Sequence, residues 1–194
     1  MWYLQKGGKG RTCTSFSLSC DGSRSRAGAV ADGVFLTWCP PSEVQQKVDL
    51  VRSGAIDAGR DPSDIEIVLS FWGFEGRGED VAVVRERCRR SVLAYAMVPT
   101  HQSAFLQAFP TLFEAATAWE AGDRRRALEL TGDDVLDAMC PIGPEGIVAT
   151  RVAQYVEAGV DLPVVFLVGP GHSGPEPAIE TMRSVSRGLA LESA

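Results

Sequence analysis

The sequence has few histidines and cysteines, and it has no long apolar run. Its 194 residues include two histidines and five cysteines. No stretch reaches the roughly 18 apolar residues that a membrane-spanning helix needs, and no charged-then-apolar signal peptide is present. The cysteines form no C-x-x-C pair, and no histidine stands at zinc-ligand spacing, which argues against a disulfide framework or a metal site. We therefore predict a cytoplasmic protein with reduced cysteines and no metal.

An excess of positive charge is also lacking. The net charge is -6, and no basic stripe with interleaved aromatic residues occurs. This balance argues against a general nucleic-acid binder and against a protein that binds anionic membranes. With 194 residues and 45% hydrophobic content, the chain is long enough to bury a sizeable core.

The first 26 residues differ in composition from the rest. Five basic residues against one aspartate give residues 1–26 a charge of +4, which leaves -10 on the remaining 168 residues. The segment is rich in Gly, Ser and Thr and has neither helical nor strand periodicity. We predict an irregular leader over residues 1–26 and a folded domain over residues 27–194.

Apolar strands and helical stripes alternate through the rest of the chain. Three strands are predicted, around residues 34–36, over 65–72 and over 162–168. Helical spacing of apolar residues predicts helices over 42–59, 79–98, 103–109, 112–121, 124–130, 133–139, 144–159 and 178–189. Strands joined through helices run parallel, so we predict an α/β fold. Three parallel strands alone leave sheet edges unpaired, which indicates part of a larger architecture.

Candidate site residues flank the first predicted strand. Thr37 stands at its carboxyl end, the edge at which parallel α/β proteins bind ligands. Asp32 and Gly33 precede the strand, and Asp32 either caps a turn or takes a direct part in a site. Gly28 marks a close approach of the backbone to a ligand or to a neighbouring helix.

Two further candidates lie later in the chain. Residues 169–174 spell G-x-G-x-x-G after a predicted strand, but only 20 residues follow, with no strand to carry the acidic residue of a dinucleotide site. We reject a Rossmann site, although Gly169 and Gly171, in a glycine-rich loop after a strand, stay candidates for a contact with a phosphate. His101, beside Tyr95, is either a proton donor or substrate contact, or a partly exposed residue at a helix entry.

Five short segments carry a family resemblance. Their order and spacing resemble the C-terminal half of the luciferase-like monooxygenase family; they are AGAVADG at 27–33, AGRDP at 58–62, DVLD at 134–137, GP at 143–144 and EAGVD at 157–161. Within the family, the chain is similar to the deazaflavin (coenzyme F-420)-dependent oxidoreductases, including methylenetetrahydromethanopterin reductase-like members. The resemblance extends from about residue 26 to residue 169.

This resemblance implies a fold and an activity. The fold is a partial (β/α)8 TIM barrel that holds the C-terminal strands and helices, with the N-terminal half missing. The activity is hydride transfer between coenzyme F-420, or alternatively FMN, and a small organic substrate. The cofactor-binding positions that it implies are Gly28, Asp32, Gly33, Thr37, Gly169 and Gly171, and among them Thr37 would bind a phosphate or polar group.

A half-barrel also implies a homodimer or a partner chain that completes the barrel. The alternative function is a catalytically inactive truncated barrel that acts only as a self-associating or partner-completed module. Family members usually carry a Gly-Pro loop near the cofactor phosphate just before the segment at 27–33. Here residues 17–23 offer only Gly22 at that place, which departs from the family pattern.

Overall fold

The computed structural model describes residues 21–171 and 174–192. The chain divides into two compact units, which we call the first unit (Met1–Phe71 and Arg151–Phe166) and the second unit (Trp72–Thr150 and Leu167–Ala194). The elements in chain order are α1 (Asp21–Val30), β1 (Gly33–Thr37), α2 (Pro41–Asp57), η1 (Pro62–Asp64), β2 (Glu66–Glu75), α3 (Gly78–Ala96), α4 (Pro99–Ala108), α5 (Leu112–Glu120), α6 (Arg124–Glu129), α7 (Asp133–Met139), β3 (Ile142–Gly143), α8 (Ile147–Glu157), β4 (Leu162–Leu167) and α9 (Glu176–Glu192). Strands alternate with helices, so the predicted α/β class is confirmed.

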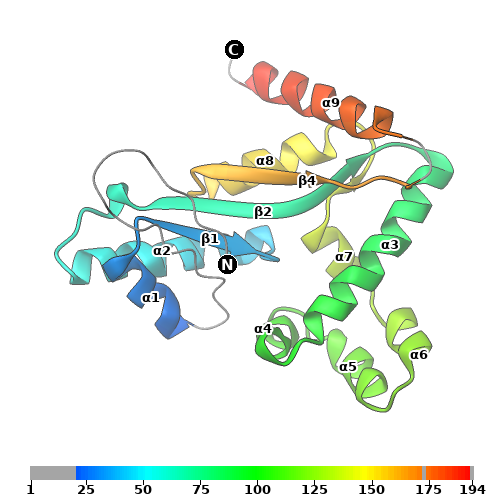
Figure 1. Ribbon diagram of the computed structural model, residues 1–194, viewed down its shortest axis with the longest axis horizontal. Helices are drawn as coiled ribbons and strands as arrows, with labels where there is room; N and C mark the ends of the chain where they lie inside the picture. The colour runs from blue at the N-terminus through cyan, green and yellow to red at the C-terminus, as the bar shows by residue number, and fades with distance from the viewer. Residues whose placement is uncertain (1–20, 172–173, 193–194) are drawn as a thin grey trace. The chain divides into compact units, whose positions relative to one another are not determined.

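In the first unit, β2 lies between β1 and β4 (Figure 1). β1 and β2 are parallel, and their register runs from Gly33 opposite Glu66 to Thr37 opposite Ser70. β4 also pairs with β2, and at its start the Asp161 N–H donates to the Ile67 carbonyl over 2.9 Å. This arrangement confirms the predicted parallel sheet for β1 and β2 and places the carboxyl end of β1 beside the middle of β2.

The apolar stripe of α2 forms much of the first unit's core. Val44, Val48, Val51 and Ala55 recur at intervals of three or four residues, and all are fully buried. This spacing places them on one face of a helix. The predicted helix over 42–59 is therefore confirmed, within two residues at each end.

α1 was not predicted. Residues 21–26 belong to this helix, so the predicted irregular leader is wrong for them, while residues 1–20 lie outside the described residues. α1 packs along α2 (Figure 1), and the small side chains of Ala27 in the helix and of Ala31 just after it are buried. Small residues give a weak periodic signal, and the helix depends on packing rather than on its own pattern.

The second unit holds a short strand that the sequence did not predict. β3 pairs in parallel with the end of β2, with Phe74 opposite Ile142 and Glu75 opposite Gly143. A strand of two residues has no periodicity to detect. β2 also continues to Glu75, three residues beyond its predicted end.

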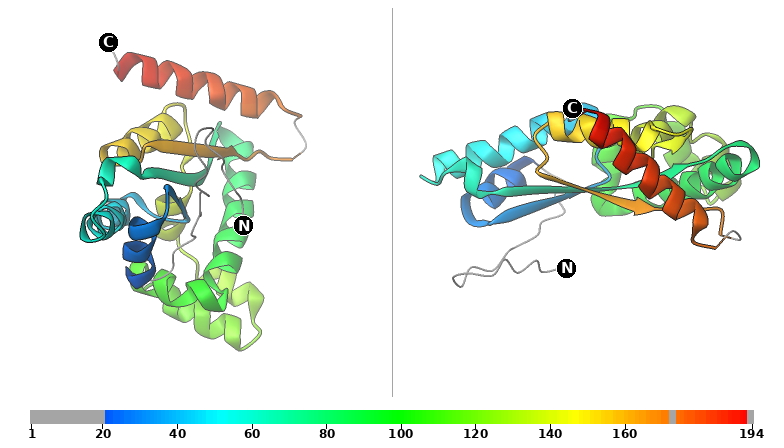
Figure 2. Two further views of the ribbon diagram at one scale, coloured as in Figure 1. Left: turned by 60° about the vertical axis from the view of Figure 1, so that its left-hand side comes forward. Right: turned by 90° about the horizontal axis from the view of Figure 1, so that it is seen from above.

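Helices make up most of the second unit. α4, α5 and α6 gather near one end of α3 (Figure 2), in the region where short helices were predicted. Arg85 and Arg89 on α3 pair with Asp133 of α7 at 2.8 and 2.5 Å, and Arg85 also reaches Asp137 at 2.5 Å. The hydrogen bonds from Arg89 and Arg85 lower the pKa of Asp133. These ion pairs join α3 to α7.

Three of the cysteines fall within the described residues. Cys39, Cys88 and Cys140 are free thiols and all are buried. A hydrogen bond with Cys140 lowers the pKa of Cys88. Within the same residues, none of the helices combines the length and apolar content that crossing a membrane requires.

Candidate functional site

Gly28 lies where α1 crosses α2. A Cβ atom at this position would stand 1.9 Å from the carbonyl oxygen of Val51 and 2.9 Å from the amide nitrogen of Ala55. Only a residue without a side chain allows the two helices to come this close. Of the two predicted alternatives for Gly28, the structure supplies the close approach to a neighbouring helix.

Asp32 lies at the junction between α1 and β1, next to Arg60. The Arg60 Nη1 donates to the carbonyls of Gly28 and Ala31, at 2.7 and 2.8 Å, and so satisfies carbonyl groups at the end of α1. The Asp32 carboxylate lies 3.7 Å from Arg60 Nη2. Asp32 therefore acts as a counter-ion to the residue that caps α1, and Gly33 follows it as the buried first residue of β1.

Thr37 lies at the opposite end of β1, as predicted. Its partner in the register is Ser70, which is 6% exposed. Residues paired in register on adjacent strands point to the same face of a sheet, so the two hydroxyl groups are neighbours. Sequence reasoning missed Ser70, although a lone hydroxyl residue within the apolar run IVLSFW was a detectable signal.

The backbone turns sharply after Thr37. Trp38 has a φ of 49°, and it is the only described residue other than glycine with a positive φ. This left-handed conformation is strained for a bulky side chain and is often held in place at functional sites. The Tyr155 hydroxyl donates to the Cys39 carbonyl over 2.9 Å and fixes the backbone just beyond the turn.

The Cys39 side chain is enclosed beside this turn. Its sulfur lies 3.1 Å from the Nζ of Lys47, and the same ammonium group pairs with Glu43 at 2.5 Å. Cys39 is 4% exposed. The lysine cation is therefore held between a carboxylate and a thiol at the start of α2.

His101 lies in the first turn of α4, in the second unit. Its ring stacks on that of Tyr95 with a centroid distance of 4.5 Å and an interplanar angle of 11°. The predicted proximity to Tyr95 is confirmed, and the side chain is half-buried, as expected of a residue at a helix entry. A role of His101 in proton transfer stays a prediction.

Gly169 and Gly171, which come after β4 in the chain, also belong to the second unit. Arg87 of α3 donates from Nη1 to the Gly169 carbonyl at 3.2 Å. Gly171 has a φ of 87°, a conformation that favours glycine, and its missing Cβ would lie 3.7 Å from the same Arg87 atom. Residues 172 and 173 of this loop lie outside the described residues. Arg87 was not predicted individually, since the Arg-rich face of its helix gave no reason to single it out.

The predicted site residues thus fall into separate groups. Gly28, Asp32 and Gly33 gather at the amino end of β1, and Thr37 lies at its carboxyl end, all in the first unit. Gly169, Gly171 and His101 belong to the second unit. The first unit brings Thr37 together with Ser70, and this pair of hydroxyl groups is the candidate ligand-binding feature of that unit.

Known proteins of similar sequence and structure are enzymes that act on diverse substrates. A 5,10-methylenetetrahydromethanopterin reductase of Methanopyrus kandleri is 25% identical over 142 residues, which cover 72% of this chain and 40% of the relative. The solved structure of a coenzyme F420 dependent tetrahydromethanopterin reductase from the same organism has a TM-score of 0.63 at 20% identity, covering 88% of this chain and 47% of that one.

Two other solved structures show the same fold. An F420-dependent secondary alcohol dehydrogenase, in complex with an F420-acetone adduct, has a TM-score of 0.60 at 16% identity, covering 91% of this chain and 49% of that one. An EDTA monooxygenase from Chelativorans sp. BNC1 has a TM-score of 0.57 at 14% identity, covering 92% of this chain and 44% of that one. The chain therefore spans less than half the length of these relatives.

These similarities confirm that the fold matches part of a luciferase-like TIM barrel, as the five short segments of the sequence predict. The family model of the luciferase-like monooxygenases matches residues 17–162, which is well over half of the chain. This chain is a member of the luciferase-like monooxygenase family.

Proposed function

We propose that the chain forms the C-terminal half of an oxidoreductase barrel that transfers hydride between coenzyme F420, or alternatively FMN, and a small organic substrate. The observation that carries the proposal is the pair of neighbouring hydroxyl groups, Thr37 and Ser70, at the carboxyl end of β1. In parallel α/β barrels this edge binds the ligand. Two solved structures of similar fold, described as F420-dependent enzymes, support the choice of cofactor.

The donor chemistry of the Thr37 and Ser70 pair suits a polar group of such a cofactor. Neither hydroxyl makes a hydrogen bond to another described residue, so both O–H groups are free to donate to a phosphate or carbonyl oxygen. The enclosed turn at Trp38 and Cys39 keeps the end of β1 in a fixed position. In this proposal Thr37 and Ser70 hold and orient the cofactor, and the cofactor supplies the hydride chemistry.

The other predicted cofactor residues have separate parts in the proposal. Gly28, Asp32 and Gly33 are proposed to set the position of β1 through α1 and Arg60. Gly169 and Gly171, with Arg87 beside them, are proposed to accept a negatively charged group in the second unit. Each group can be tested independently by substitution.

The test is a fluorescence titration of the purified chain with coenzyme F420 and, separately, with FMN. We expect saturable one-to-one binding of one of them. Thr37→Val should weaken this binding about tenfold, since it removes a hydrogen bond to a charged group while preserving side-chain shape. Thr117→Val is the matched control, because the Thr117 hydroxyl bonds within α5 to the Phe113 carbonyl.

Two results would count against the proposal. One is a folded chain that binds neither cofactor. The other is binding that Thr37→Val and Thr117→Val reduce equally, which would place the cofactor away from the end of β1. A shift in the fluorescence of the cofactor rather than of tryptophan should be monitored, since Trp38 adjoins the substituted residue.

A specific observation also favours the second candidate function, a partner-completed module. β4 is apolar in sequence, yet its Leu162 and Phe166 are 46% and 51% exposed. We propose that strands of the other half of a luciferase-like barrel cover β4, because this chain matches less than half of its relatives' length. That half would belong to the same protein or to a separate chain.

Size-exclusion chromatography with light scattering tests this second candidate. The purified chain should associate with an added N-terminal half of a related barrel, and Phe166→Glu should abolish the association while leaving the circular dichroism spectrum unchanged. Ile56→Glu is the control, since Ile56 is 61% exposed on α2, away from β4 in sequence. Self-association without binding of the added half would point to a second copy as the partner instead.

A further inference from the structure

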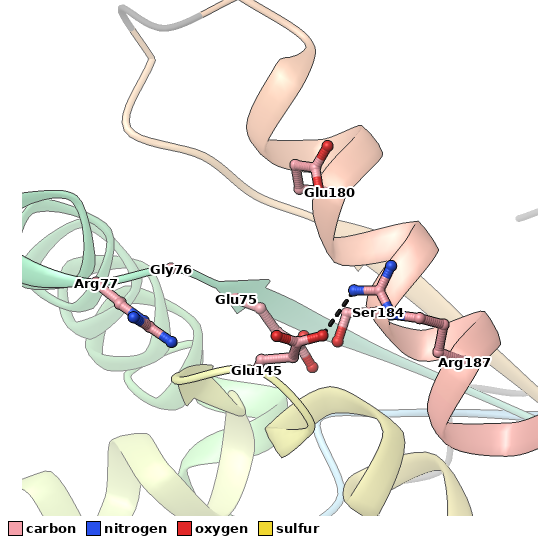
Figure 3. A pocket seen from close by; sticks show the side chains of 7 residues that line it. All are labelled: Glu75, Gly76, Arg77, Glu145, Glu180, Ser184 and Arg187. Carbon is pink, nitrogen blue, oxygen red and sulfur yellow. Dashed lines mark hydrogen bonds and ion pairs between the residues drawn. The ribbon is translucent and has the colours of Figure 1, made fainter. Parts of the chain in front are cut away.

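A polar hollow of about 250 Å³ lies in the second unit, at the end of β2. Figure 3 shows the side chains around it, which come from the end of β2, from the residues before α8 and from α9. Its charged and hydroxyl-bearing lining residues are Glu75, Arg77, Glu145, Glu180, Ser184 and Arg187. None of the site residues predicted from the sequence belongs to it.

Glu75 forms the floor of this hollow. It is the last residue of β2 and is 7% exposed. Its Oε1 accepts a hydrogen bond from the backbone N–H of Val148, in the first turn of α8, over 3.0 Å, where the helix N-terminus favours a negative charge. Its backbone N–H donates to the Thr181 Oγ1 of α9 over 3.1 Å. The contact with α8 therefore fixes the carboxylate of Glu75, and the contact with α9 fixes its backbone.

Two polar atoms of the floor have no hydrogen-bond partner among the described residues. They are the Oε2 of Glu75 and the Oγ of Ser184, and Ser184 is itself 5% exposed. Figure 3 shows both side chains facing the same space. A buried carboxylate oxygen without a partner is costly, so a group that donates hydrogen bonds is needed there.

The rim of the hollow is already neutralised. Glu145 pairs with Arg187 at 2.6 Å and Glu180 pairs with Arg183 at 2.7 Å. Arg77 is exposed, so its charge is screened by solvent. Arg187 also interacts electrostatically with Glu180 and Glu75, so this one arginine is shared among three carboxylates. The Oε2 of Glu75 still lacks a hydrogen-bond donor, which favours a cation with N–H donors. A divalent metal ion would need more oxygen ligands than this floor offers.

We propose that the hollow binds a small organic ammonium ion, whose N–H groups donate to the Oε2 of Glu75 and to the Oγ of Ser184. An ammonium group carries three donors and no acceptor, which matches a floor of unpartnered acceptor atoms. The volume leaves room for a short carbon chain attached to that group. This site is independent of the proposed oxidoreductase function, because it uses none of the proposed cofactor residues.

The experiment is an amide NMR titration of the full chain with propylammonium chloride, with sodium chloride and sodium propionate as matched titrations. We expect saturable shifts at Glu75, Val148 and Thr181 with propylammonium alone. Glu75→Gln keeps the acceptor for the Val148 N–H but removes the charge, and it should weaken binding about tenfold or more. Glu180→Gln is the control at the rim and should change the affinity less than twofold.

Ser184→Ala provides a second variant should Glu75→Gln fail to fold. It should weaken propylammonium binding several-fold, because a neutral hydrogen bond contributes less than a charged one. The proposal would be overturned by shifts that sodium chloride reproduces, by preferential binding of propionate, or by equal losses in the Glu75→Gln and Glu180→Gln variants. An absence of saturable shifts would indicate that only water fills the hollow and would likewise overturn it.

Discussion

The two units use different polar contacts to join their elements. In the first unit, side chains bond to the backbone: the buried Tyr155 donates to the Cys39 carbonyl, and the carboxylate of the exposed Asp161 accepts from the Ile67 N–H at 2.7 Å. In the second unit, α3 and α7 are joined by ion pairs, and the side chain of their central carboxylate, Asp133, is 64% exposed. The comparison teaches that solvent conditions should affect the exposed α3–α7 ion pairs far more than the buried hydrogen bond of Tyr155.

The largest expected effect comes from Gly28→Ala, which attacks the packing of the first unit. The new Cβ would overlap the backbone of α2, so α1 must move and uncover buried surface. We expect a loss of about 2 kcal/mol of unfolding free energy, in spite of the better helix propensity of alanine. Urea denaturation followed by circular dichroism measures this loss.

Gly169→Ala serves as the control for that substitution. No atom lies within 4 Å of the position that its Cβ would take. The free energy of unfolding of the Gly169→Ala variant should stay within about 0.5 kcal/mol of that of the unmodified chain. Equal stability of Gly28→Ala and Gly169→Ala would contradict the tight contact between α1 and α2.

Tyr155→Phe should have an intermediate effect. The substitution keeps the ring, which packs against Phe71 at a centroid distance of 5.1 Å, and removes only the hydroxyl donor. The Cys39 carbonyl loses a buried partner, so we expect a loss of about 1.5 kcal/mol. The loss should be the same at low and high salt, and a strong salt dependence would undermine the distinction between the units.

Asp133→Asn should have the smallest effect and should depend on solution conditions. Exposed ion pairs contribute little, so the loss at neutral pH and low salt should be about 0.5 kcal/mol, and high salt should remove it. The pKa of Asp133 is lowered in the folded chain. Its contribution is thus present above the unfolded aspartate pKa of about 3.9 and is lost as pH falls through the lower folded value.

Denaturation of Asp133→Asn and of the unmodified chain at several pH values checks this prediction. The difference between them should shrink as the solution becomes acidic. A difference that persists at high salt, or that grows in acid, would show that the α3–α7 contact is not governed by exposed charge.

The sequence was sufficient for elements with a strong apolar pattern. β1 and α2 were located almost to the residue, because residues 34–36 form an apolar run and the α2 stripe has helical spacing. In the structure Val34 and Leu36 are buried, as that run predicts. α1 and β3 escaped notice, since one depends on small side chains packed against α2 and the other on two backbone pairings with β2. Both depend on contacts between segments distant in sequence.

The candidate site was predictable only in part, for the same reason. Thr37 could be assigned from its place at a strand end, but Ser70 becomes its neighbour only through the register of β1 and β2. Glu75 likewise lies beyond the predicted end of its strand and was not singled out, and its contacts with α8 and α9 come only from the tertiary fold. Residue type and local spacing do not encode such pairings, which come from the tertiary fold.

The most direct test of the central claim is a double-mutant cycle on cofactor binding with Thr37→Val and Ser70→Ala. If both hydroxyl groups hold one polar group of coenzyme F420 or FMN, their effects on affinity should be coupled by about 0.5 kcal/mol or more. Each single variant should weaken binding, and the double variant should lose less than the sum. Strictly additive effects, or no effect of either substitution, would contradict a shared site at the carboxyl end of β1.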